Sequence, residues 1–154
     1  MILGFTGTRE PITKLQSDWL WWLFEHVKIE QGHHGACINA DEAFHDMALA
    51  HQVPLMVHPS SSKKHMAQGL IAVRCLVAHP LVTVLPAKPP LNRDREIVGA
   101  SQGLVALPVQ LHQPPPLQWG GTWFTVDYAL RMNRPVIICY PDGRVEKRNV
   151  RGRL

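Results

Sequence analysis

The sequence predicts an α/β fold, a Rossmann-like three-layer sandwich in which helices cover both faces of a mainly parallel sheet. Three observations lead to this prediction. Short apolar runs of strand length alternate with longer segments whose apolar residues recur at helical spacing. Glycine, proline and polar residues separate these segments, as is typical of turns and loops. The clearest unit, residues 120–143, joins a glycine pair, a helical pattern and the apolar run 135–140.

The first half of the chain begins with a strand that runs into a loop at Gly7 and Thr8. Pro11 suits the first turn of a helix, and the apolar residues that follow it have helical spacing. The expected elements are a strand at 2–6, a helix at 13–29, a short strand and turn at 33–37, a helix at 41–51 and a buried strand at 53–57.

The second half repeats the alternation, which implies parallel strands joined by right-handed crossovers. The prolines within 86–90 exclude a helix there. The expected elements are a polar loop at 60–64, a helix at 66–78, strands at 81–85, 103–107 and 135–140, helices at 91–100 and from Thr122, a proline-rich loop at 112–116 and a turn at 141–143.

Length and composition indicate one globular domain, residues 1–154, whose segment 144–154 forms a basic tail or an edge hairpin. Hydrophobic residues make up 45% of the chain and charged residues 18%, as in ordinary globular proteins. No apolar run approaches the ~20 residues of a membrane span, and the N-terminus lacks the pattern of a signal peptide. The three cysteines have no CxxC spacing, so we expect reduced thiols in a cytoplasmic protein.

The formal net charge of +4, to which the C-terminal tail contributes, suits anionic ligands. Nucleic acid stays open as a partner but is not favoured, because basic and aromatic residues are not interleaved. The nine histidines do not follow HExxH or a zinc-binding Cys/His spacing, so we expect no metal and no cofactor.

The glycine pair Gly120-Gly121 and the helix expected to start at Thr122 form a potential anion site. Glycine lets a ligand approach the backbone, and a helix start offers unpaired N–H groups and a positive dipole end. A plain flexible turn is the alternative interpretation. The sequence therefore predicts a site for a phosphate group.

Four loops at the carboxyl ends of the expected strands carry suggestive residues, and ligands of open parallel sheets bind at that edge. The loops are 6–9, 35–41, 86–95 and 120–122. The candidate ligand-binding residues are Gly7, Thr8, Arg9, Gly35, Ala36, Asp41, His58, Pro86, Arg93, Arg95, Gly120, Gly121 and Thr122. For some of them a structural role is the alternative: a turn for Thr8, a helix cap for Asp41, and exposed positions at a helix start for the two arginines of 86–95.

Four segments resemble the SLOG superfamily, the Rossmann-like group that includes the cytokinin-activating LOG proteins and the DprA-type proteins. They are GFTGTRE, GACINADEAFHDMALAHQVPLMVHP, PAKPPLNRDREIVGASQGLVALP and GGTWFTVDYALRMNRPVIICYPDG, and they span most of the chain. The last two segments are the most specific.

The resemblance implies roles for several of the candidates. Gly120, Gly121 and Thr122 would hold a phosphate, and Thr8 and Arg9 would face the same pocket. Asp41 would accept hydrogen bonds from a ribose or orient its loop. Arg93 and Arg95 would bind a phosphate or a base, with Glu96 orienting one of them.

One departure concerns the glutamate of the GGxGTxxE motif of LOG-type hydrolases, because Thr125 stands at that position. Glu96, Asp127 and Asp41 are weak candidates for a replacement carboxylate. The leading hypothesis is therefore a protein that senses or sequesters a nucleotide, a phosphoribosyl compound or an ADP-ribose-like molecule. A nucleoside 5′-monophosphate phosphoribohydrolase is the alternative, and a DprA-like DNA-associated module is the second alternative.

Self-association is also expected, as a homodimer or a higher homo-oligomer. Trp19, Trp21, Trp22 and Phe24 crowd one predicted helix. A core position accounts for most of this cluster, but it is wider than one buried face needs. Pairing of two copies through this helix is the other interpretation.

Overall fold

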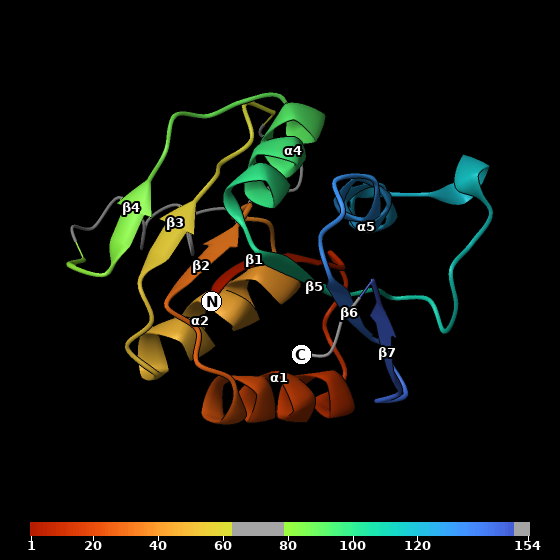
Figure 1. The fold of residues 1–154 in the computed structure, drawn as a ribbon, viewed down its shortest axis with the longest axis horizontal. Helices are drawn as coiled ribbons and strands as arrows, with labels where there is room; N and C mark the ends of the chain where they lie inside the picture. Colours follow the sequence, from red (N-terminus) through yellow and green to blue (C-terminus); the bar gives the residue numbers. More distant parts are fainter. Residues whose placement is uncertain (63–78, 150–154) are drawn as a thin grey trace.

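The structure is a computed structural model, which describes residues 1–62 and 79–149 (Figure 1). The helix expected over 66–78 lies outside the described residues, as do Cys75 and the end of the basic tail. The strands are β1 (Ile2–Gly7), β2 (Gln31–His34), β3 (Leu55–Val57), β4 (Val82–Val84), β5 (Gly103–Leu107), β6 (Val136–Cys139) and β7 (Val145–Arg148). The helices are α1 (Lys14–His26), α2 (Ala40–Ala50), α4 (Pro90–Ala100), the short η1 (Pro116–Gln118) and α5 (Gly121–Arg131).

All seven strands form one sheet in the order β4-β3-β2-β1-β5-β6-β7. Every pair is parallel except β6 with β7, where Val136 is opposite Arg148 and Cys139 is opposite Val145. The chain moves outward from β1 to β4 on one side, returns, and builds the other side from β5. The order therefore reverses between β1 and β5, and ligands bind at such a switch point in open α/β sheets.

Helices cover both faces of the sheet, so the predicted three-layer α/β sandwich is confirmed. The helices α1 and α2 lie on one face, and α4 and α5 lie on the other (Figure 1). Side chains alternate along a strand, so successive residues of β5 pack into the helical layers on opposite faces of the sheet. Val105 and Leu107 belong to the α1/α2 core, whereas Leu104 and Ala106 belong to the α4/α5 core.

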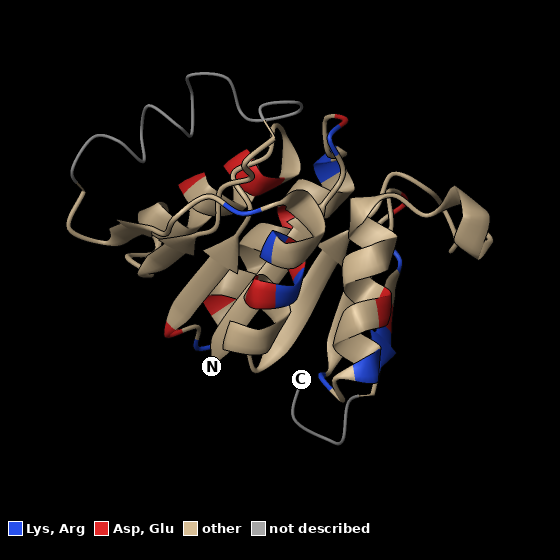
Figure 2. Cartoon of the chain, turned by 90° about the horizontal axis from the view of Figure 1, so that it is seen from above, with Lys and Arg blue, Asp and Glu red and all other residues tan. Residues whose placement is uncertain are grey.

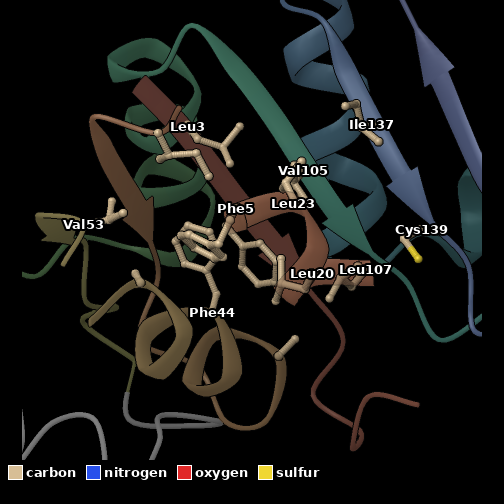
Figure 3. Close-up of a cluster of buried hydrophobic side chains, with 14 of the residues drawn as sticks. Leu3, Phe5, Leu20, Leu23, Phe44, Val53, Val105, Leu107, Ile137 and Cys139 are labelled. Carbon is tan, nitrogen blue, oxygen red and sulfur yellow. The ribbon is translucent and has the colours of Figure 1, made fainter. Parts of the chain in front are cut away.

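The α1/α2 core is built around aromatic rings from three elements (Figure 3). Phe5 of β1 stacks on Phe44 of α2 at 4.5 Å between ring centroids, and Phe24 of α1 lies 5.4 Å from Phe44. These contacts fix α1 and α2 against the end of β1, from which the candidate site begins.

The helix α1 starts with a capping box, in which the Thr13 hydroxyl accepts from the Gln16 amide and the Gln16 side chain accepts from the Thr13 amide. Phe24 is buried and Trp19 packs against the core, whereas Trp21 and Trp22 are exposed, so core positions account for half of the aromatic cluster rather than most of it. No helix among residues 1–62 and 79–149 has the length and apolar character to cross a bilayer.

Candidate functional site

A cavity of about 350 Å³ opens at the switch point of the sheet, where β1 and β5 end. The loop after β1 and the starts of α2, α4 and α5 surround it. Its walls consist of residues 5–10, Gly35, Cys37, Asp41, Pro90, Leu91, Arg93, Asp94, Ile97, Val109, Gln110 and residues 120–123. The cavity thus brings together residues from all four loops that the sequence singled out.

The loop after β1 supplies one wall and is held tightly. Gly7 packs against the start of α2, since a Cβ atom at position 7 would lie 2.4 Å from the Cβ of Ala40. Thr8 is buried, and its hydroxyl accepts from the Glu10 amide at 3.0 Å. Arg9 is exposed at the cavity, and its carbonyl accepts from the Asn39 side chain. The loop therefore presents one exposed cation, Arg9, to the cavity.

The opposite wall is the first turn of α5. Gly120 precedes this helix and gives it no side-chain cap, and the first intrahelical bond runs from the Phe124 amide to the Gly120 carbonyl. In the part of the chain that the structure describes, the amides of residues 121–123 donate to no acceptor. A Cβ atom on Gly120 would have no neighbour within 4 Å. The turn therefore offers N–H groups and the positive end of the helix dipole to a cavity occupant.

Arg93 extends from α4 beneath the loop after β2 and is only 6% exposed. Its Nη1 donates to the carbonyls of Gly35 and His58, the latter at 3.4 Å. Its Nε lies 2.8 Å from Oδ1 of Asp94. Its Nη2 contacts Sγ of Cys37 at 3.8 Å. The guanidinium is therefore used mainly to tie α4 to the loop after β2 and to the end of β3.

Asp94 lies next to Arg93 in the wall and is 7% exposed. Its Oδ2 faces the start of α5, 3.8 Å from where a Cβ atom of Gly121 would stand. Burial raises the pKa of this carboxyl, and its contacts with Arg93 and Thr125 partly offset that effect. The cavity consequently contains a carboxyl group close to the uncapped first turn of α5.

Asp41 occupies the start of α2 and is also buried. One of its oxygens accepts from the amides of Gly35 at 3.2 Å and Cys37 at 3.0 Å. Burial raises the pKa of Asp41 to about 6, against the lowering effect of the Cys37 amide and Arg93. A carboxyl with such a pKa exists in both protonation states close to neutral pH, as a general acid or base requires.

Thr125, on the second turn of α5, is fully buried. Its hydroxyl donates to the Gly121 carbonyl at 2.7 Å and lies against the Asp94 carboxyl. The helix therefore contributes no carboxylate at this position, and the neighbouring acid comes from α4.

Nine of the residues proposed from the sequence line the cavity: Gly7, Thr8, Arg9, Gly35, Asp41, Arg93, Gly120, Gly121 and Thr122. Four other ligand-binding candidates and two carboxylate candidates do not line it: Ala36, His58, Pro86, Arg95, Glu96 and Asp127.

Arg95 lies instead over the rings of Phe124 and Tyr128 on α5, 5.5 and 5.9 Å from their centroids. Asp127 pairs with Arg131 one turn along α5, at 2.8 Å. Both side chains therefore make their contacts on the outer surface of the α4/α5 layer, away from the cavity.

His58 belongs to a separate polar chain behind the cavity. Its Nε2 lies 2.8 Å from Nδ1 of His33, and its Nδ1 lies 3.5 Å from Glu96, which also pairs with Lys88. Burial and the neighbouring His58 lower the pKa of His33 to about 4. This chain links β2, β3 and α4, and the bond from Arg93 to the His58 carbonyl connects it to the cavity wall.

Acidic and basic residues are interspersed along the helices (Figure 2). The described part of the basic tail is engaged with the protein: Arg144 donates to the Leu111 carbonyl and lies over the Tyr140 ring, and Arg148 pairs with Glu146.

The residues that the sequence reasoning missed include Asp94, Cys37, Gln110 and Trp123. Helical spacing could have revealed Asp94. The positions 90, 93, 94 and 97 share one face of a helix, whereas 95 points to another side. All four residues of that face line the cavity.

No protein-family model matches the sequence, and no curated protein matches it. Among solved structures, the chain is similar to the X-ray structure of TM1055, a structural genomics target. The TM-score is 0.57 with 11% sequence identity, over 88% of this chain and 71% of TM1055. At this identity the likeness concerns the fold, and it agrees with the Rossmann-like architecture.

Proposed function

We propose that this protein binds a phosphorylated small molecule in the cavity between β1 and β5, with nucleotides and nucleotide-derived phosphoribosyl or ADP-ribose-like compounds as the ligand class. The observation that supports it most is the uncapped first turn of α5, which opens into a cavity at the switch point of the sheet. The SLOG-type sequence pattern points to the same ligands.

The two sides of the cavity suit the two parts of such a ligand. Backbone amides at a helix start bind phosphate oxygens, and the side chain of Arg9 can add a charge-assisted hydrogen bond. Phe5, Leu91, Ile97, Val109 and Trp123 give the rest of the wall an apolar character suited to a sugar or a base.

A ligand screen tests the proposal. Nucleoside monophosphates, ADP-ribose, cyclic nucleotides and their unphosphorylated nucleosides would be compared by thermal shift and then by calorimetry. A ligand at about 100 times its dissociation constant should add about 2.7 kcal/mol to the free energy of unfolding. The proposal is wrong if no phosphorylated compound stabilises the protein, or if nucleosides stabilise it equally well.

A second candidate function, hydrolysis of the N-glycosidic bond of a nucleoside monophosphate, is favoured by one observation. Asp41 is the only one of the three carboxylate candidates from the sequence that lines the cavity, and its pKa of about 6 suits proton transfer. Release of free base from a nucleotide panel would be measured with wild-type protein and with Asp41→Asn. The hydrolase interpretation fails if the wild-type protein releases no base at high concentration, or if the variant is equally active.

A further inference from the structure

The wall of the proposed anion site contains a second negative group, which its occupant must accommodate. Asp94 is buried and lines the same cavity as the first turn of α5. Its Oδ1 is engaged by Arg93 at 2.8 Å, while its Oδ2 faces Gly121. The N-cap residue of α5 is Gly120, which has no side chain and therefore supplies no acceptor to the first amides of the helix. A carboxyl and an uncapped set of amides therefore face the same space.

A fully ionised oxyanion on these amides would meet the Asp94 carboxylate at close range, where repulsion in a partly buried site is strong. One proton between the two groups turns this repulsion into a short, charge-assisted hydrogen bond. Inorganic phosphate keeps a proton near neutral pH and can supply it, whereas sulfate has the same shape and charge but no proton.

We propose that Asp94 makes this site select phosphoryl groups over sulfuryl groups, by sharing one proton with an oxygen of the bound phosphate. The inference rests on the proposed binding function and adds a specificity determinant to it. A phosphomonoester that arrives fully ionised takes up this proton on its own oxygen when it binds, whereas a sulfuryl group is too weak a base to do so.

The other charged and polar groups around Asp94 fit this role. Three groups favour the ionised form of Asp94: Arg93 on α4, Arg9 in the loop after β1, and the contact with Thr125 on α5. Burial and the negative charge of Asp41 at the start of α2 oppose ionisation. Arg93, Thr125 and Arg9 thus support the ionised carboxyl, which accepts the proton of a bound phosphate, although burial raises the pKa of Asp94. Arg93 holds the carboxyl in position, and Oδ2 remains directed at the helix start.

The test compares sodium phosphate with sodium sulfate near neutral pH and at constant ionic strength. Binding is followed by NMR shifts of the Gly121 and Thr122 amides, which report on this helix start rather than on adventitious surface sites. The proteins are the wild type, Asp94→Asn, and Asp127→Asn as the matched control on α5, whose side chain pairs with Arg131 outside the cavity.

The wild type should bind phosphate at least about tenfold more tightly than sulfate, the size of one charge-assisted hydrogen bond. In Asp94→Asn the preference should fall to within about threefold, mainly because sulfate binds more tightly, and Asp127→Asn should keep the wild-type ratio.

Three results would overturn the inference. Equal affinities in the wild type would do so without any variant, even if Asp94→Asn failed to fold. An unchanged ratio in folded Asp94→Asn would show that the carboxyl only holds Arg93 in place. Absence of phosphate binding refutes it as well, and the proposed function survives that result only if a nucleotide from the screen still binds.

Discussion

The backbone of Gly35 and the guanidinium of Arg93 are in such close contact that a Cβ atom at position 35 would lie 2.3 Å from Nη1. The same Nη1 donates to the Gly35 carbonyl, so the end of β2 and the side chain from α4 fit together only with glycine at this position.

We expect Gly35→Ala to displace Arg93 from its carbonyl partners and to lower the free energy of unfolding by about 1–3 kcal/mol, as overpacking does in a buried site. Urea denaturation measures this change. The matched control is Gly99→Ala in α4, where a new Cβ atom meets nothing within 4 Å. Alanine there should leave stability unchanged or raise it by up to about 1 kcal/mol. Equal effects of the two substitutions would contradict the contact.

Arg9 is the freest cation of the cavity wall, because its side chain is exposed. Arg9→Gln should weaken a phosphorylated ligand about tenfold, the cost of one charge-assisted hydrogen bond, while the melting temperature of the free protein stays the same. Calorimetry with the best compound of the screen measures the affinity. Lys14→Gln, which removes an exposed cation paired with Asp18 on α1, should bind like the wild type. Equal ligand affinities in the wild type and both variants would show that Arg9 does not contact the ligand.

Thr125 tests whether α5 tolerates a carboxylate of its own. Thr125→Glu would place a second acid in a fully buried position beside Asp94, so we expect a loss of about 3 kcal/mol or more in unfolding free energy. Thr125→Ser keeps the hydroxyl and should cost less than about 1.5 kcal/mol. Thermal and urea unfolding measure both variants. A stable Thr125→Glu protein would show that the cavity has room for the acid, against our expectation.

The buried pair of His33 and His58 predicts sensitivity to acid. The pKa of His33 is about 4 in the folded protein, lowered by burial and by His58, against 6.5 for an ordinary histidine. Between these values the unfolded chain binds more protons, so stability is complete above about pH 6.5 and is lost as the pH falls toward 4. The loss attributable to His33 amounts to about 3 kcal/mol at most.

Urea unfolding at a series of pH values checks this expectation. His33→Gln should show a flatter dependence on pH over this range than the wild type, even if its stability near neutral pH is lower. The control is His26→Gln, which changes an exposed ring on α1 and should keep the wild-type slope. A slope in His33→Gln as steep as that of the wild type would show that the loss arises elsewhere.

The sequence predicted the strands and helices of the described residues well, because apolar spacing determines which face each element buries. The position of the candidate site could also be predicted, because the carboxyl ends of parallel strands, and the loops that follow them, meet at one edge of the sheet. The composition of the site was harder to predict, because it depends on the rotation of α4. Arg93 and Arg95 seemed equivalent in sequence, yet they lie on different sides of the helix, and Asp94 shares the cavity face with Arg93. The exposure of Trp21 and Trp22 could be predicted only in part. The aromatic cluster is wider than one buried face needs, but its spacing does not show which of its members are exposed.

The reversal of direction at β7 has a practical consequence for experiments on this protein. Because β7 runs antiparallel to β6, Arg148 lies beside Val136, at the edge of the sheet opposite the one where β1 and β5 end. A surface tether or a fluorescent label attached just after β7 would begin on the side of the molecule away from the cavity. Immobilisation through that end should therefore leave the entrance open to ligands in flow-based binding measurements.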